Sequence, residues 1–199
     1  LLNQHPDIYM SANKEPAYFF RDEIYRKEIE WYSKLFEPGK IKKYRGESST
    51  YYFKYLPALA RMKKDLTDPK FIIILRHPIQ RVISHYYWLR GKGLEFRSFK
   101  KAIEHDMNED FRPGYHIKGH YKCYIQNSFY SKWISNYFDF FGKENVFVIT
   151  NEYLKREPLI TVNSCFTFLG LTKLTDIRII NHNKSVHKNI PTWDRYILH

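Results

Sequence analysis

A basic and a hydroxyl side chain flank a predicted turn from a strand to a helix. Arg76 follows an apolar run at residues 71–75, which predicts a strand buried on both faces. Pro78 is typical of a first helical turn, and Ser84 falls about two turns into that helix. Anions bind at the carboxyl ends of strands and at helix N-termini, and a guanidinium with a hydroxyl suits a phosphate. The sequence therefore indicates an anion site here, with a structural salt bridge of Arg76 as the alternative.

The composition limits what kind of protein could carry such a site. A length of 199 residues suits one domain, residues 1–199, and a hydrophobic content of 43% is enough for one core. A net charge of +12 indicates anionic partners, such as a nucleotide, an acidic glycan, a nucleic acid or an acidic membrane. The charge is spread along the chain, so it argues only weakly for nucleic acid. No apolar run approaches the roughly 20 residues that span a membrane.

Strand and helix patterns alternate along the chain. Strands are predicted near residues 8–10, 43–47, 71–75 and 146–150. Between and after them lie predicted helices at 21–36, 57–67, 96–105 and 128–141, besides those that begin at Pro78 and Pro158. Helices between strands favour parallel pairing through crossovers. The sequence therefore predicts a three-layer α/β sandwich with a short, mostly parallel central sheet.

The cysteines and histidines give little support for a metal site or a disulfide framework. Cys123 and Cys165 are far apart in the sequence and belong to no paired motif, although a single bridge between them is compatible with the sequence. His105, His116 and His120 are not fixed on one face by any pattern, so no metal is expected. The low use of cysteine favours a cytoplasmic protein, with the Golgi lumen as the alternative for a eukaryotic chain.

The segment after the apolar run at residues 71–75 resembles a motif of a known family. The pattern Arg-x-Pro-x-x-Arg-x-x-Ser-x-Tyr, formed by Arg76, Pro78, Arg81, Ser84 and Tyr86, resembles the 3′-phosphate-binding motif of sulfotransferases. These enzymes use 3′-phosphoadenosine 5′-phosphosulfate as donor and release 3′-phosphoadenosine 5′-phosphate. The resemblance implies that Arg76 and Ser84 bind the 3′-phosphate of this nucleotide. It also implies the P-loop-like fold of that family.

A second stretch resembles the carbohydrate-type members of the family. Taken alone, Lys14 and Glu15 read as solvated residues in a loop that leads into a core of aromatic side chains. The pattern Lys-Glu-Pro-x-x-Phe-Phe is similar, however, to a segment in which a glutamate is the general base towards the acceptor. The resemblance therefore implies that Glu15 takes the proton of the acceptor. Trp31 and Tyr32 also match the family and are interpreted as packing residues.

Two further stretches match the family with substitutions. The loop that begins Gly46-Glu47 is similar to one that borders the acceptor cleft, but Ser48 stands where many carbohydrate-type members have a lysine. The tail around Lys184 and Ser185 resembles a loop that closes over the 3′-phosphate, with a serine in place of the usual glycine. The resemblance implies that Lys184 and Ser185 contribute to nucleotide binding. A loop such as Lys-x-Gly-Thr-Thr, which binds the 5′-phosphosulfate, is absent from the 199 residues, and we expect it immediately before Leu1.

Together these features imply transfer of a sulfuryl group to a hydroxyl or amine. The expected partners are the nucleotide donor and an acceptor that is a glycan or a small metabolite, with carbohydrate favoured. An alternative is a degenerate, non-catalytic module that binds a nucleotide or an anionic glycan. Binding of nucleic acid is a third reading, and no recognised motif supports it.

Overall fold

The computed structural model describes residues 1–108 and 123–179, and these form two compact units. The first unit comprises Leu1–Leu75 and Lys132–Ile179. The second contains residues 76–108 and 123–131. We describe each unit by itself.

Four short strands of the first unit form two parallel pairs. β1 (Ile8–Met10) pairs with β2 (Tyr44–Gly46), and β3 (Phe71–Leu75) pairs with β4 (Val146–Thr150). All four strands lie where the sequence predicts them. Within the described part of the chain the two pairs are separate sheets. The sequence pattern identified the strands and their parallel direction, but it carries no information on which strands are neighbours.

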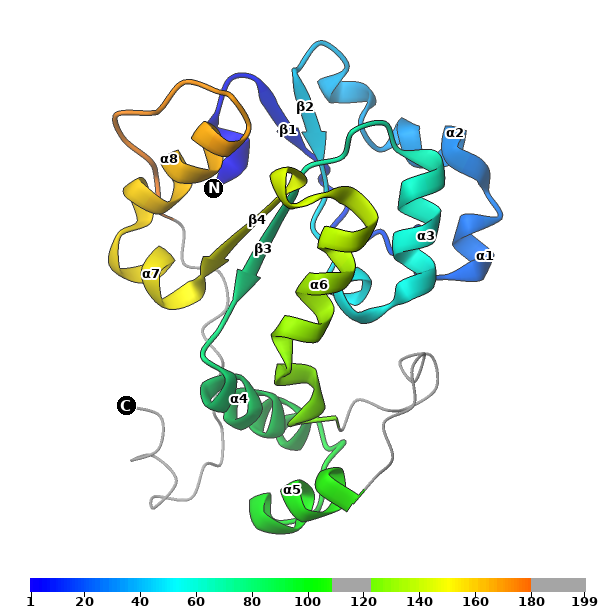
Figure 1. Cartoon of the computed structure of the whole chain (residues 1–199), viewed down its shortest axis with the longest axis vertical. Helices are drawn as coiled ribbons and strands as arrows, with labels where there is room; N and C mark the ends of the chain where they lie inside the picture. The colour runs from blue at the N-terminus through cyan, green and yellow to red at the C-terminus, as the bar shows by residue number, and fades with distance from the viewer. Residues whose placement is uncertain (109–122, 180–199) are drawn as a thin grey trace. The chain divides into compact units, whose positions relative to one another are not determined.

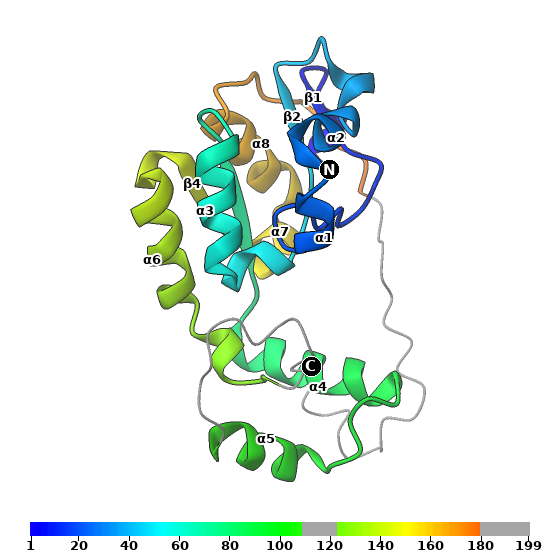
Figure 2. The ribbon, with the colours of Figure 1, turned by 90° about the vertical axis from the view of Figure 1, so that its right-hand side faces the viewer.

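Helices cover both faces of these strands. α3 (Leu56–Asp65) and α6 (Tyr130–Phe141) lie side by side, whereas α7 (Asn151–Arg156) and α8 (Pro158–Phe168) lie on the other side of β4 (Figures 1 and 2). Alternation along the strands accounts for the two layers. Ile73 packs into the aromatic core with α3 and α6, whereas Ile72 packs with Phe166 of α8. The predicted three-layer α/β architecture is confirmed.

One detail of the central strand differs from the prediction. Residues 71–75 were expected to be buried on both faces, but the side chain of Ile74 is 55% exposed. Its neighbour Leu75 is the last residue of β3, and Ile74 therefore lies close to the carboxyl end of the strand. Five consecutive apolar residues predict a strand, but they do not show how far the covering helices extend.

The helix predicted at residues 21–36 is two helices, and this prediction was wrong. α1 (Asp22–Tyr25) and α2 (Glu28–Lys34) are separated at Glu28, whose φ of +65° is incompatible with a continuing α-helix. The two helices have different partners. Arg61 of α3 binds Asp22 and lies 4.5 Å from the ring centroid of Tyr25, whereas α2 buries Tyr32.

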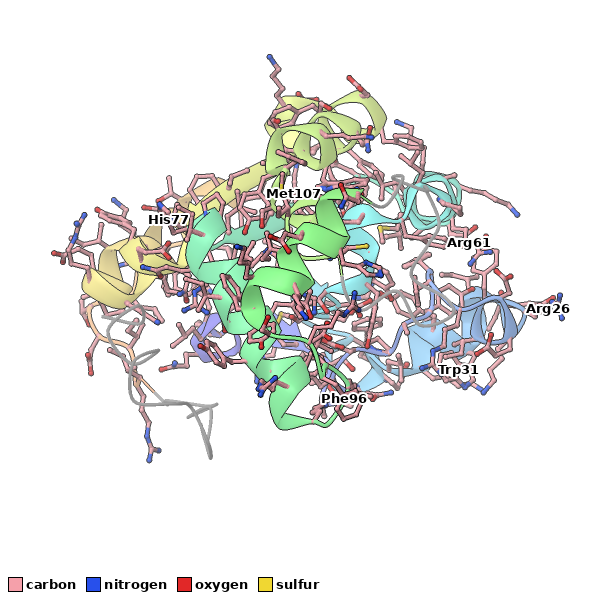
Figure 3. The ribbon with its side chains drawn as sticks, turned by 90° about the horizontal axis from the view of Figure 1, so that it is seen from below. Arg26, Trp31, Arg61, His77, Phe96 and Met107 are labelled. Atoms are coloured by element: carbon pink, nitrogen blue, oxygen red, sulfur yellow. The ribbon has the colours of Figure 1, made fainter. Side chains whose placement is uncertain are left out.

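The second unit contains α4 (Pro78–Gly91) and α5 (Phe99–Asn108). α4 begins at Pro78 as predicted, but α5 begins three residues later than expected. The carboxylate of Glu95 accepts hydrogen bonds from the backbone N–H groups of Phe96 and Arg97, at 3.0 and 3.1 Å, and thereby holds this segment outside the helix. Phe96, the first residue of the predicted helix, lies outside α5 and is 83% exposed. Figure 3 labels its side chain.

Short 3₁₀ helices complete the described structure. They are η1 (Leu2–Gln4), η2 (Glu37–Gly39), η3 (Tyr51–Lys54), η4 (Gln126–Ser128) and η5 (Lys143–Asn145). None of the helices in residues 1–108 and 123–179 is both long and apolar enough to cross a bilayer.

Candidate functional site

Glu15 lies at the carboxyl edge of the β1–β2 pair. β1 ends at Met10 and β2 ends at Gly46, and these two residues are partners in the parallel register. The backbone N–H of Ser11 donates to the carbonyl of Gly46 at 2.8 Å, which continues the pairing by one step. The loops that follow the two strands therefore leave from the same edge, where ligands bind in α/β proteins. One of these loops carries Glu15.

The backbone around Glu15 is strained. Glu15 has a φ of +52° and Ala17 a φ of +55°, both in the left-handed region that non-glycine residues rarely occupy. Such conformations are concentrated at functional sites, where the surrounding structure holds them in place. The carboxylate of Glu15 accepts a hydrogen bond from the hydroxyl of Thr50, with an Oγ1–Oε1 distance of 3.2 Å. This contact joins the two loops.

Glu15 lines an open groove of about 520 Å³, which we call the Glu15 groove. Its charged members besides Glu15 are Lys14, Arg21 and Lys27, all exposed at the surface. Two aromatic side chains, Trp31 and Tyr51, also line it, and the remaining wall is formed by Asn13, Pro16, Ala17 and Ile24. The groove thus combines one carboxylate with three cations and two aromatic rings.

Sequence reasoning missed most of this groove. Trp31 was interpreted as a packing residue, although it lines the groove and is only partly buried. The ammonium of Lys27 lies 4.8 Å from the centroid of the Trp31 ring, which places a cation beside an aromatic surface. The four-residue spacing of these two residues within the helix predicted at residues 21–36 was the only available signal, although Lys27 in fact precedes α2.

Buried aromatic side chains hold the end of the loop that carries Glu15. Tyr18, Phe19 and Phe20 are buried, as the ordinary reading of the sequence predicted. The rings of Tyr18 and Tyr32 stack with their centroids 4.6 Å apart and their planes 16° apart. Three consecutive buried aromatic residues anchor the chain directly after Ala17, so the strained segment has little freedom to relax.

Arg76 and Ser84 belong to the second unit. Arg76 directly follows β3, and its carbonyl accepts a hydrogen bond from the hydroxyl of Tyr130 at 2.9 Å. The Nε atom of Arg76 is buried and has no hydrogen-bond partner among the residues that the structure describes. A buried guanidinium donor without an acceptor suits an anionic ligand. Ser84 lies on α4 and is partly buried.

The second arginine of the motif has a different environment. Arg81 donates from Nε to the hydroxyl of Ser128 at 2.6 Å and from its guanidinium to the carbonyl of Tyr124. These contacts tie α4 to the segment that precedes α6, and burial lowers the pKa of Arg81. Arg81 therefore has a structural role, whereas the Nε atom of Arg76 meets no acceptor in the part of the chain that the structure describes.

With this geometry established, the chain can be compared with known proteins. The model of the sulfotransferase domain matches residues 1–190. This chain belongs to the sulfotransferase domain family. The family resemblance predicted from the motifs is thereby confirmed.

Curated relatives support the same assignment. The sulfotransferase domain is 30% identical over 176 residues to heparan sulfate glucosamine 3-O-sulfotransferase 5 of Mus musculus and to the Homo sapiens protein of that name. In both cases the match covers 86% of this chain and 48% of the relative, so the chain spans about half of their length. It is also 33% identical over 119 residues to the membrane-associated sulfotransferase kil1 of Dictyostelium discoideum, which covers 55% of this chain and 24% of that protein.

A solved structure shows the same fold. The crystal structure of a sulfotransferase from Alicyclobacillus acidocaldarius matches with a TM-score of 0.71 and 26% sequence identity. The match covers 99% of this chain and 81% of that one. The predicted α/β sulfotransferase fold is confirmed.

The predicted site residues of this sulfotransferase domain fall into three groups. Glu15 lies in the first unit, and Arg76 and Ser84 lie in the second. Lys184 and Ser185 lie outside the described residues, as do His116 and His120. No group of three potential metal ligands occurs in the described ranges. Cys165 is buried, and burial raises the pKa of its thiol to about 11.

Proposed function

We propose that this chain transfers a sulfuryl group from 3′-phosphoadenosine 5′-phosphosulfate to a hydroxyl of a glycan. A new bond forms between the acceptor oxygen and sulfur as the bond between sulfur and the 5′-phosphate oxygen breaks. The proton of the acceptor hydroxyl passes to Glu15, and 3′-phosphoadenosine 5′-phosphate leaves. Catalysis would rest on positioning and charge stabilisation, as in phosphoryl transfer.

The observation that carries the proposal is the setting of Glu15. Its carboxylate lies in an open groove, on a strained loop at the carboxyl edge of two parallel strands. A general base must reach the proton that it takes, and an open groove lets an acceptor approach. Membership of the sulfotransferase family supports the choice of reaction.

Arg76 and Ser84 are the proposed ligands of the 3′-phosphate. The buried Nε of Arg76 supports this role, because a phosphate oxygen would supply the acceptor that residues 1–108 and 123–179 do not provide. The first turn of α4 adds backbone N–H groups, which favour an anion. Lys184 and Ser185 are further proposed contacts to the same phosphate. Bound donor supplies the activated sulfuryl group, and these residues orient it.

The composition of the Glu15 groove supports an anionic glycan as the acceptor. Lys14, Arg21 and Lys27 offer three cations to sulfate or carboxylate groups. The rings of Trp31 and Tyr51 offer apolar surfaces against which sugar rings can pack. The curated relatives named heparan sulfate glucosamine 3-O-sulfotransferases are consistent with such an acceptor.

The test is transfer of a radiolabelled sulfuryl group by the intact protein. Heparan sulfate and the same polymer after chemical removal of its sulfate groups are offered in parallel with labelled donor. We expect label on the sulfated polymer and much less on the desulfated one. Equal labelling would contradict the anionic-glycan assignment, and absence of label on glycans, amines and small hydroxyl compounds would contradict the sulfotransferase proposal.

A further inference from the structure

A second carboxylate lies close to Glu15. Glu47 is the first residue after β2, at the same strand edge from which the Glu15 loop departs. It is partly buried, and it accepts hydrogen bonds from the hydroxyl of Tyr32 at 3.3 Å and from that of Ser49 at 2.6 Å. Tyr32 belongs to α2, so Glu47 joins the loop to that helix.

The groups around Glu47 come from several elements. Tyr32 faces it from α2, Tyr52 from η3 and Tyr137 from α6, and the Glu15 carboxylate is its charged neighbour. Burial raises the pKa of Glu47, the hydrogen bonds from Ser49 and Tyr32 lower it, and the charge of Glu15 raises it further. The charge of Glu15 is the smallest of these contributions to the pKa of Glu47.

Thr50 connects Glu47 to the proposed base. Two features hold the loop that follows β2. At its start, the hydroxyl of Ser49 donates a hydrogen bond to the carboxylate of Glu47, and at its end the side chain of Tyr52 is buried. Between these two points the hydroxyl of Thr50 donates to the Glu15 carboxylate at 3.2 Å. Thr50 itself is exposed. Its position therefore follows from the anchoring of its neighbours rather than from burial of its own side chain.

We propose that Glu47 is a positioning residue that orients the Glu15 carboxylate through the Thr50 hydroxyl. This inference rests on the proposed function, in which Glu15 is the base. A carboxylate on a strained loop beside an open groove has several rotamers, and only some direct it at the acceptor. The hydrogen bond from an anchored Thr50 selects among them. Glu47 does not touch the acceptor and acts only by holding the loop.

The first test removes the hydrogen bond between Thr50 and Glu15 and leaves the contacts of Glu47 in place. Thr50→Val has nearly the same shape but no hydroxyl, and Thr50 is exposed, so we expect this variant to fold. We expect kcat to fall about tenfold, because misorientation of a reacting group by a fraction of an ångström lowers the rate strongly. The KM for the donor and the thermal midpoint should change little. Thr50→Ser, which restores the hydroxyl, should recover most of kcat.

A matched control lies elsewhere in the first unit. Thr67 is exposed, and Thr67→Val, which makes the same chemical change, is expected to leave both kcat and the thermal midpoint at their wild-type values. A comparable loss of kcat in this variant would contradict a specific role of Thr50. The same conclusion would follow if Thr50→Val turned over at the wild-type rate.

The second test asks whether Glu47 acts through Thr50. Glu47→Gln is expected to lower kcat by a similar factor while the protein stays folded. If Glu47 acts through Thr50, the kcat of the double variant should be little lower than that of the slower single variant. A kcat of the double variant that is reduced by the product of the two single reductions would contradict the proposal, because it would indicate independent roles.

The same experiments separate this inference from the proposed function. A wild-type protein that transfers no label would overturn both. A wild-type protein that transfers label, loses transfer in Glu15→Gln and keeps it in Thr50→Val would retain the proposed function and overturn the positioning role alone.

Discussion

The Glu15 region and the Arg76 region differ in how the chain builds them. Arg76 and Ser84 are eight positions apart on one continuous segment that runs from β3 into α4. The Glu15 region is assembled from three separated stretches, which are the loop after β1, helix α2 and the loop after β2. A continuous segment can be recognised from local spacing. A site assembled from distant stretches can be recognised only in part before the fold is known.

The two regions also differ in what holds them. The Glu15 loop depends on buried aromatic rings and on the partly buried carboxylate of Glu47 with its hydroxyl partners. The second unit depends on Arg81, whose guanidinium connects α4 to Tyr124 and Ser128. Both regions thus contain one group proposed for chemistry or binding and another that maintains the structure around it. The following predictions test this division of roles.

The largest effect is expected from Glu15→Gln. Glutamine keeps the contact to Thr50 but cannot take a proton, so transfer should fall by about 10² to 10⁴. Binding of 3′-phosphoadenosine 5′-phosphate should be unchanged in calorimetric titration. Glu37→Gln is the matched control, because Glu37 is exposed and paired only with Lys40 in the described structure. Normal turnover by Glu15→Gln would remove Glu15 from the mechanism.

The next effect concerns stability. Arg81→Met should lower the free energy of unfolding by about 3 kcal/mol, because it removes a partly buried cation from its hydrogen-bond acceptors. Urea denaturation provides the measurement. Arg90→Met, on the exposed side of the same helix, should cost less than about 1 kcal/mol. Equal costs for the two variants would show that Arg81 is not the structural arginine of the motif.

Arg76→Ala separates binding from stability in the same motif. It should weaken the binding of 3′-phosphoadenosine 5′-phosphate by about 2 kcal/mol, or roughly 30-fold, through loss of a charged hydrogen bond. Binding of ADP, which has no 3′-phosphate, should not change. Lys100→Ala is the control, since Lys100 is an exposed cation of the second unit. A parallel loss of ADP affinity would place Arg76 elsewhere on the nucleotide or in the fold.

Ser84→Ala should have a smaller effect in the same titration. Removal of one neutral hydroxyl donor is worth about 1 kcal/mol, or about fivefold in affinity. The thermal midpoint should be preserved. An affinity equal to that of the wild type would show that the 3′-phosphate does not contact Ser84.

The smallest effect is a pH dependence at Glu47. The pKa of Glu47 is raised in the folded state, mainly by burial. A raised carboxyl pKa stabilises the folded protein while the group is protonated, and this contribution is lost as the pH rises through the folded-state pKa. The stability of Glu47→Gln relative to the wild type should therefore increase from acid to neutral pH. A difference that does not vary with pH in urea denaturation would contradict the raised pKa.

The sequence predicted the fold class because its periodic patterns are local. Apolar runs identified β1, β3 and β4, and Pro78 and Pro158 marked the starts of α4 and α8. The strand at β2 has no apolar run and was indicated by the family resemblance of the loop that follows it. The break at Glu28 and the late start of α5 were missed. The first accompanies the contact of Arg61 with Asp22, which is distant in the sequence, and the second accompanies hydrogen bonds to the Glu95 carboxylate that an apolar pattern does not reveal. In the site, Glu15 was identified through a motif. Thr50, Lys27 and Trp31 were not, because only the folded chain brings them to one edge.

The most direct test of the central claim is a single-turnover measurement with the intact protein, labelled donor and heparan sulfate. Released 3′-phosphoadenosine 5′-phosphate and label on the glycan are followed in the same reaction. We predict that the two products appear at equal rates and in equal amounts. Tight nucleotide binding without transfer of label would contradict the claim and would favour a non-catalytic binding module.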